Sequence, residues 1–271
     1  MFRTVLTSLL AVLVLCGSAF AAEKTLIAAA NPTWPPMEFL DENKNIIGYD
    51  RDIIAAIAEE IGMKSEFRNI AWDGIFASLE SGQANVIASC VTITDKRKKA
   101  YVFSDPYYEV HQAVVVAKDS AIKKPEDLKG KKVGVQIGTT AIEALRKMNV
   151  DIDLRTYDEV GLVFEDMRNG RLDVVVCDDP VARYYASRKE GYKDLMKVAF
   201  LTEDVEYIGF VFSKDNAELA AQVNKGLKAI RENGITSHHY TLKPHDSQHI
   251  PSPLTPFSQP NVTVHSVHSN E

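Results

Sequence analysis

Two stretches of the chain, "LESGQANVIASC" (Leu79–Cys90) and "MRNGRLDVVVCD" (Met167–Asp178), follow the same plan. Each contains the end of a helical pattern that stops at a glycine, then a short polar turn, then a run of β-forming residues. Strand and helix patterns alternate before and after both stretches. We therefore expect an α/β protein with two similar lobes, in which helices cover both faces of each sheet.

The same alternation extends from Thr25 to Gly234. Apolar residues at helical spacing predict a helix over residues 51–62, with Asp50 as its N-cap and Gly62 at its end. The proline-rich stretch 31–39 is expected to be a loop. The other predicted helices cover residues 72–82, 139–148, 159–170, 178–191 and 217–234. The predicted strands cover residues 25–30, 84–91, 131–138, 153–158 and 172–177.

Two further runs of β-forming residues, 111–120 and 205–216, lie between and after these sets of elements. We interpret them as two extended crossings between the lobes, which together make a hinge. The helix at 217–234 would then return to the first lobe with one apolar face. The predicted domains are lobe 1 (residues 22–112 plus 209–235) and lobe 2 (residues 113–208).

Composition and the N-terminus indicate an exported protein. The chain has 271 residues, 45% hydrophobic and 25% charged, with a formal net charge of −6, which makes nucleic acid an unsuitable partner. Arg3, the apolar run Leu9–Leu15 and the small residues of Ala19–Ala21 predict a cleavable signal peptide over residues 1–21. Leu15 before Cys16 does not fit a lipid-attachment box, so we expect plain secretion to the periplasm rather than a lipoprotein.

The C-terminal tail and the cysteines carry little chemistry. Residues 236–271 are rich in Pro, Ser and His without strand or helix period, so they are predicted to be disordered. Their histidines imply no ordered ligand geometry, and we predict no metal site and no cofactor.

Cys90 and Cys177 remain after cleavage, and export permits a disulfide. Two buried thiols are the favoured interpretation, because free Cys is among the most buried residue types.

The stretch after the strand at 84–91 has the features of an anion site. Thr94 and Asp95 open a helix there, and backbone N–H groups at a helix start attract negative charge. Arg97 lies in the first turn, where its guanidinium can hold a carboxylate through two parallel hydrogen bonds, and Thr92 adds a hydroxyl. An exposed arginine beside a routine threonine cap remains an equal alternative from these residues alone.

The second lobe has a matching turn and an acidic strand end. Residues 138–140 follow a strand and open a helix, at the sheet edge where α/β proteins usually bind ligands. Asp178 or Asp179 could receive an ammonium group, or could merely cap the helix that starts at Pro180. Trp34 and Trp72 follow strand ends of the first lobe and could enclose an apolar side chain, although a lone tryptophan is usually core.

Four segments resemble the bacterial extracellular solute-binding proteins of family 3, the periplasmic receptors that supply polar amino acids to ABC importers. They are "GYDRDIIAAIAEEIG", "GIFASLESGQANVIASCVTITDKRKKAYVFSDPYY", "KKVGVQIGTTAIEAL" and "GRLDVVVCDDP". The likeness runs from Thr25 to Gly234. It implies a two-lobed periplasmic-binding-protein (Venus flytrap) fold of type II, with two hinge crossings, that closes on one free amino acid.

The resemblance also implies roles for individual residues. Arg97 would hold the ligand α-carboxylate, with Thr92 and the backbone N–H of Thr140 assisting and Thr139 beside that contact. Asp178 would hold the α-ammonium group. The backbone C=O of Cys90 would be a second partner for the ammonium, and the ligand side chain would meet Asn31, Trp34, Trp72 and Gln136.

Two departures from the family pattern affect these expectations. Many relatives that take cationic ligands have an acidic residue where this chain has Asn31, so a polar or neutral side chain is favoured. The family usually continues past Gly234 with a short aromatic and basic helix, which the tail of this chain replaces. That difference concerns the completeness of lobe 1 and not the pocket.

The resemblance predicts a binding protein and not an enzyme: a monomer that delivers its amino acid to an ABC transporter permease. The alternative is a cyclohexadienyl or arogenate dehydratase-like enzyme on the same scaffold, which would need an added general acid or base in the cleft. Glu38 and His111 are the nearest candidates, and each also has a simple structural explanation. A separate signalling partner in place of the permease stays open.

Overall fold

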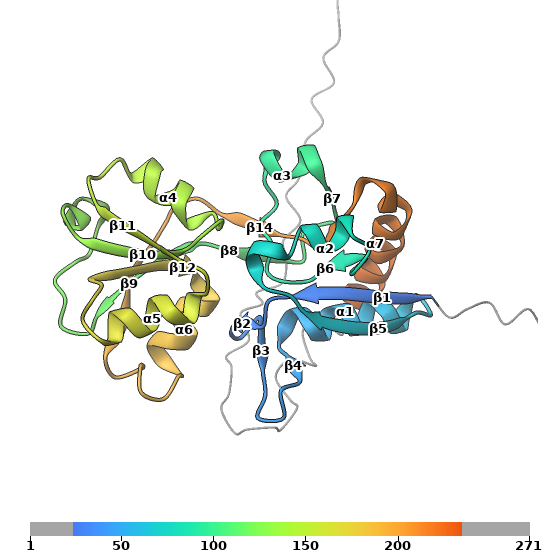
Figure 1. Ribbon diagram of the computed structural model, residues 1–271, viewed down its shortest axis with the longest axis horizontal. Helices are drawn as coiled ribbons and strands as arrows, with labels where there is room; N and C mark the ends of the chain where they lie inside the picture. Colours follow the sequence, from blue (N-terminus) through green and yellow to red (C-terminus); the bar gives the residue numbers. More distant parts are fainter. Residues whose placement is uncertain (1–23, 235–271) are drawn as a thin grey trace, which may run out of the picture.

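The computed structural model describes residues 24–234, which form two α/β lobes joined by extended strands (Figure 1). The predicted signal peptide and the predicted C-terminal tail lie outside these residues. Within residues 24–234 no helix combines the length and the apolar character that crossing a membrane requires.

Lobe 1 is built on a five-stranded sheet with the order β5-β1-β6-β15-β7. Strand β1 is parallel to β5 and β6, whereas β15 is antiparallel to β6 and β7. The strands are β1 (Thr25–Ala30), β5 (Lys64–Asn69), β6 (Val86–Ile87), β7 (Val102–Phe103) and β15 (Val211–Phe212). The helices of this lobe are α1 (Tyr49–Glu60), η1 (Trp72–Gly74), α2 (Ala77–Glu80), α3 (Asp95–Ala100), η3 (Lys214–Asn216) and α7 (Ala217–Glu232).

Lobe 2 repeats this arrangement with the strand order β11-β10-β12-β9-β13. Strand β10 is parallel to β11 and β12, and β9 is antiparallel to β12 and β13. The strands are β9 (Gln112–Ala117), β10 (Lys132–Gln136), β11 (Asp153–Tyr157), β12 (Val174–Asp178) and β13 (Met196–Leu201). The helices are η2 (Pro125–Leu128), α4 (Ala141–Met148), α5 (Val160–Arg168) and α6 (Asp179–Ser187).

The two similar stretches of sequence occupy equivalent places in the two sheets. In each lobe the first strand of the βα units lies between the second and the third, as β1 lies between β5 and β6 and β10 between β11 and β12. The stretches that end in β6 and β12 supply that third strand. Because parallel strands end at the same edge of a sheet, the segments after β1, β6, β10 and β12 can meet in one cleft.

The hinge is a two-stranded antiparallel ladder of β8 (Tyr108–Val110) and β14 (Glu206–Ile208). In Figure 1 both strands run across the space between the lobes. Helix α7 then returns to lobe 1, as predicted. A Cβ atom on its Gly226 would lie 2.9 Å from Cγ2 of both Ile57 and Ile61 near the end of α1, so the glycine permits close helix packing. The lobe boundaries drawn from the sequence stay predictions.

Four local predictions were wrong. The first hinge crossing was expected over residues 111–120, but Gln112–Ala117 form β9, an inner strand of the lobe 2 sheet, and the crossing is made by β8 just before it. Asp50 does not cap α1: the N-cap residue is Gly48, and the Asp50 carboxylate instead accepts a hydrogen bond from the Cys90 backbone N–H at 2.5 Å. The helix expected over 72–82 is two short pieces, η1 and α2. The proline-rich loop contains β2 (Thr33–Trp34) and β3 (Glu38–Leu40), which pair with each other and with β4 (Ile46–Ile47).

Candidate functional site

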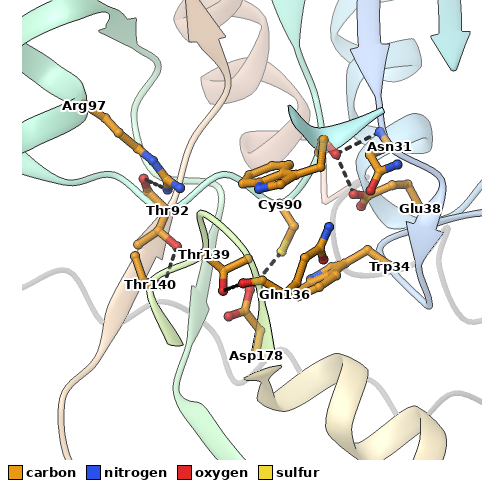
Figure 2. Close-up of a pocket in the computed structure, with 12 residues that line it drawn as sticks. Asn31, Trp34, Glu38, Cys90, Thr92, Arg97, Gln136, Thr139, Thr140 and Asp178 are labelled. Carbon is orange, nitrogen blue, oxygen red and sulfur yellow. Dashed lines mark hydrogen bonds between the residues drawn. The ribbon is translucent and has the colours of Figure 1, made fainter. Parts of the chain in front are cut away.

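The structure brings all ten predicted site residues to one pocket between the lobes (Figure 2). The pocket encloses about 350 Å³ of space between atoms, including open solvent. Lobe 1 contributes Asn31, Trp34, Trp72, Cys90, Thr92 and Arg97, and lobe 2 contributes Gln136, Thr139, Thr140 and Asp178. Two residues that the prediction left out, Glu38 and Ser89, also line it. Whether these residues contact a ligand stays a prediction.

Arg97 forms one end of the pocket and already links the lobes. Its backbone N–H donates to the side chain of Thr94, the N-cap of α3, as the sequence predicted. The guanidinium donates to the Thr92 carbonyl at 2.8 Å and, across the cleft, to the Gly138 carbonyl at 3.1 Å. It lies 5.8 Å from the Trp72 ring centroid, which is within cation–π range. Since a guanidinium has five N–H donors, it retains capacity for a carboxylate.

A second interlobe hydrogen bond lies beside the first. The indole Nε1 of Trp72 donates to the carbonyl of Ile137 at 2.9 Å. Gly138, the next residue, has a φ of +74°, and a Cβ atom there would lie 3.1 Å from that indole nitrogen. The turn before α4 therefore needs a glycine both for its left-handed backbone and for the approach of lobe 1.

Two residues that sequence reasoning missed connect the threonines to the hinge. One carboxylate oxygen of Glu206, at the start of β14, accepts from the Thr140 hydroxyl at 2.6 Å and lies 3.3 Å from the Thr92 hydroxyl. The amide Nε2 of Gln112 donates to the same oxygen at 3.2 Å and to Asp178 at 2.6 Å. The sequence showed Glu206 and Gln112 only as members of the hinge crossings, because nothing local places them near a threonine.

Asp178 ends β12 and lies at the N-cap position of α6, but its side chain makes no capping hydrogen bond. Its carboxylate instead faces the pocket, where it accepts from Gln112 and lies 3.5 Å from the Cys90 thiol. Burial, followed by the charge of the nearby Glu206 carboxylate, raises the pKa of Asp178 to about 7. A cation that enters the pocket would stabilise the ionised form of this buried carboxyl, because it would compensate the negative charge.

Cys90 is in the left-handed backbone region, with φ 47°. Its hydrogen bond to Asp50 holds this conformation, which is uncommon for a residue with a side chain. Burial and the neighbouring Asp178 charge raise the pKa of the Cys90 thiol well above its usual range. Cys90 and Cys177 are both buried and free, as predicted.

The opposite end of the pocket contains a second buried carboxyl, from Glu38 on β3. Its Oε1 accepts from the Ser89 hydroxyl at 2.8 Å, and that hydroxyl in turn accepts from the Asn31 backbone N–H at 3.0 Å. Oε2 is buried and has no N–H or hydroxyl donor at hydrogen-bonding distance among residues 24–234, and a protonated Glu38 can donate to the neighbouring Asp50 carboxylate. Burial, followed by the charge of Asp50, raises the pKa of Glu38 well above its usual range. Figure 2 shows Glu38 beside Asn31, far from Arg97.

The remaining predicted residues line the walls. Trp34 is buried, and its Nε1 has no hydrogen-bond partner within the described chain. The Gln136 amide donates to the Asp158 carbonyl at 2.9 Å, and the Thr139 hydroxyl donates to the Gln136 carbonyl at 2.8 Å. His111 lies outside the pocket lining, with its Nδ1 2.9 Å from the Thr202 carbonyl. Among the described residues no cluster of three or more His, Cys, Asp or Glu could hold a metal ion.

Comparison with known proteins identifies the family. The model for "Bacterial extracellular solute-binding proteins, family 3" matches residues 26–241. The chain belongs to this family. It is 34% identical over 214 residues to a probable histidine-binding protein of Neisseria gonorrhoeae. The aligned region covers 78% of this chain and 80% of the relative.

Solved structures agree with this assignment. An ancestral arginine-binding protein bound to glutamine is 37% identical, with a TM-score of 0.75, over 80% of this chain and 96% of that one. An ancestral amino acid-binding protein, a precursor of cyclohexadienyl dehydratase, is 36% identical, with a TM-score of 0.73, over 80% and 93%. The predicted family and the type II two-lobed fold are therefore confirmed.

Proposed function

We propose that this protein captures one free amino acid between its lobes in the periplasm and delivers it, as a monomer, to the permease of an ABC importer. The observation that carries the proposal is the pairing of a guanidinium from lobe 1 with a buried carboxyl from lobe 2 in one pocket. Arg97 and Asp178 offer opposite charges to the two charged groups that every free amino acid has.

The α-carboxylate would bind at the Arg97 end. The N–H groups of Arg97 that the Thr92 and Gly138 carbonyls do not use can form a bidentate pair with it. The backbone N–H of Thr140, at the start of α4, adds a donor and the favourable end of the helix dipole. The α-ammonium group would bind Asp178, with the Cys90 carbonyl as a further acceptor.

The ligand side chain would extend toward Asn31 and Glu38, between the two tryptophans. Burial favours the neutral form of Glu38, and Asn31 and Gln136 are neutral, which supports a polar, uncharged side chain. A protonated carboxyl can both donate and accept hydrogen bonds, so Glu38 favours side chains that also carry a donor and an acceptor, such as a primary amide or an imidazole. Trp34 and Trp72 provide apolar surface for the methylene part of such a side chain.

Binding would drive closure of the lobes. A ligand held by Arg97 and Asp178 together makes its full set of contacts only when the lobes are closed, so it shifts the population toward that form. The direct bonds from Trp72 and Arg97 to residues 137 and 138 add to closure without touching the ligand. A closed form that exists mainly with ligand is a suitable signal for a membrane permease.

Mass spectrometry of the small molecules that stay bound during gentle purification tests this proposal, followed by calorimetric titration with L-glutamine, L-histidine, L-arginine, L-cystine and L-leucine. We expect one amino acid to copurify and to bind tightly, with 1:1 stoichiometry. If none copurifies and none of the five binds, the proposal is wrong.

Glu38 also favours a second candidate function. A buried carboxyl with a raised pKa inside a ligand pocket is the kind of group that acts as a general acid. The protein would then be a dehydratase that acts on a cyclic carboxylic acid held by Arg97. Incubation with prephenate and with arogenate tests this: product formation that Glu38→Gln abolishes would establish the enzyme, and no turnover would exclude it.

A further inference from the structure

Glu206 shares a single carboxylate oxygen, Oε2, among three donors. Thr140 donates its hydroxyl proton at 2.6 Å, Gln112 donates an amide proton at 3.2 Å, and the Thr92 hydroxyl lies 3.3 Å away. Thr92 comes from lobe 1, Thr140 from lobe 2 and Glu206 from the hinge strand β14. The cluster therefore joins all three parts of the molecule at the edge of the pocket.

The proton count in this cluster restricts what the two hydroxyls can do. A threonine hydroxyl has one proton and two lone pairs. Thr140 uses its proton for Glu206, because 2.6 Å is a short hydrogen bond to a carboxylate. The Thr92 hydroxyl has two neighbours, the Thr140 oxygen at 3.3 Å and Glu206 at 3.3 Å, and each of them can only accept from it. Both protons are thus used inside the cluster.

The orientation of Gln112 supports this count. Its Nε2 lies between two carboxylate oxygens, of Asp178 and Glu206, so this atom must be the NH₂ group and not the carbonyl oxygen. The same Nε2 lies 3.3 Å from the Thr140 hydroxyl oxygen, to which it can only donate, and the acceptor Oε1 has no hydrogen-bond partner among the described residues, so Gln112 takes neither threonine proton. The same amide holds Asp178 in the network, so the acidic group of lobe 2 and the oriented hydroxyls share one support.

We propose that Glu206 is a positioning residue. Its carboxylate turns the hydroxyl protons of Thr92 and Thr140 into hydrogen bonds inside the cluster, so that Thr92 presents lone pairs to the pocket and selects ligands with an α-ammonium group. Thr92 then acts with Asp178 on the ammonium, and the α-carboxylate depends on Arg97 and backbone N–H groups. This inference rests on the proposed function. It differs from the sequence-based expectation, in which Thr92 assists the carboxylate.

Paired ligands and two substitutions test the inference. The ligands are L-histidine and L-arginine, each with the analogue in which a hydroxyl replaces the α-amino group, imidazolelactic acid and argininic acid. Glu206→Met keeps the side-chain length and removes the acceptor, which frees both hydroxyl protons. Glu206→Gln removes the charge and keeps an acceptor oxygen. Glu203→Gln, at an exposed position three residues earlier, is the control for loss of charge.

Calorimetry measures the ratio of the affinity for each amino acid to that for its hydroxy analogue. We expect this ratio to fall at least tenfold in Glu206→Met and to stay within about threefold of the wild type in Glu206→Gln and Glu203→Gln. Thermal unfolding without ligand establishes that each variant folds. A Glu206→Met ratio equal to that of the wild type overturns the inference, and so does an equal fall in Glu206→Gln, which would assign the effect to charge.

The outcome separates this inference from the proposed function. If the wild type binds neither amino acid nor any other member of the five-ligand panel, the proposed function fails and the inference fails with it. If the wild type binds an amino acid other than these two, that amino acid and its hydroxy analogue replace them. If the wild type binds and the ratios do not follow the expected order, only the role of Glu206 is wrong.

Discussion

Replacing Arg97 with alanine is the most direct test of the proposed site. The substitution removes a bidentate pair of charge-assisted hydrogen bonds to the ligand carboxylate, each worth about 1.5–3 kcal/mol. It also removes the hydrogen bond to the Gly138 carbonyl, which links the two lobes. We expect a loss of about 3–6 kcal/mol in binding, or roughly 10²- to 10⁴-fold in Kd.

Arg97→Lys separates charge from geometry. Lysine keeps the positive charge but replaces the planar fork with a single point contact. About half of the lost free energy should return, which leaves an affinity roughly 10- to 150-fold below that of the wild type. Isothermal titration calorimetry with the amino acid that binds the wild type measures both variants in one buffer.

The fold should survive both changes, because Arg97 lies on α3 outside the hydrophobic core, and no residue of α3 is buried. Unfolding temperatures measured without ligand should therefore stay close to that of the wild type. An Arg97→Ala protein that folds normally and binds within fivefold of the wild type would refute the assignment of Arg97 to the carboxylate.

Three other predictions concern the lobes, the buried acids and the ligand side chain. Trp72→Phe removes the interlobe bond to the Ile137 carbonyl, and calorimetry should show affinity roughly 2- to 10-fold weaker; Gly138→Ala, which crowds the same indole, should act in the same direction. Asp178 has a pKa of about 7 in the folded protein against an ordinary value of 3.8, so the folded state binds more protons and ligand-free stability should fall as pH rises from about 4 to 7. Asp178→Asn should remove that part of the pH dependence, seen by calorimetry of unfolding, and raise ligand-free stability at pH 8 while weakening amino acid binding. Glu38→Gln should weaken binding of L-arginine more than that of L-glutamine, because only the cation gains from ionised Glu38; equal losses would contradict a contact between Glu38 and the side chain.

Much of the fold follows from local patterns. Helical spacing of apolar residues identified α1, α5 and α7, and valine-rich runs identified β10 and β12, because these segments bury one face or both faces in any α/β protein. The errors came where a side chain serves a distant partner. Asp50 stands where an N-cap is expected, but its carboxylate holds the Cys90 backbone N–H instead.

The pocket residues also divide into those that local sequence identified and those that distant contacts bring to the pocket. Thr92, Arg97, Thr140 and Asp178 were identified because each lies where a strand gives way to a turn or helix, and parallel strands bring such ends to one edge. Ser89 has the same local signal, since it directly precedes Cys90 at the end of such a strand. Glu38 was noted in the sequence without a place in the pocket, because the short strands β2 and β3 direct it there through pairing that proline-rich sequence does not indicate.

The sequence by itself determined two α/β lobes, a hinge of two crossings, and a guanidinium and a carboxylate at strand ends, because these features depend on residue spacing and chain order. Only the tertiary structure decided which groups are neighbours across the cleft. The contacts of Arg97 with Gly138, of Trp72 with Ile137 and of Glu206 with both threonines join residues that are 41 to 114 positions apart. No local preference encodes these contacts, since they arise only when the hinge sets one lobe against the other.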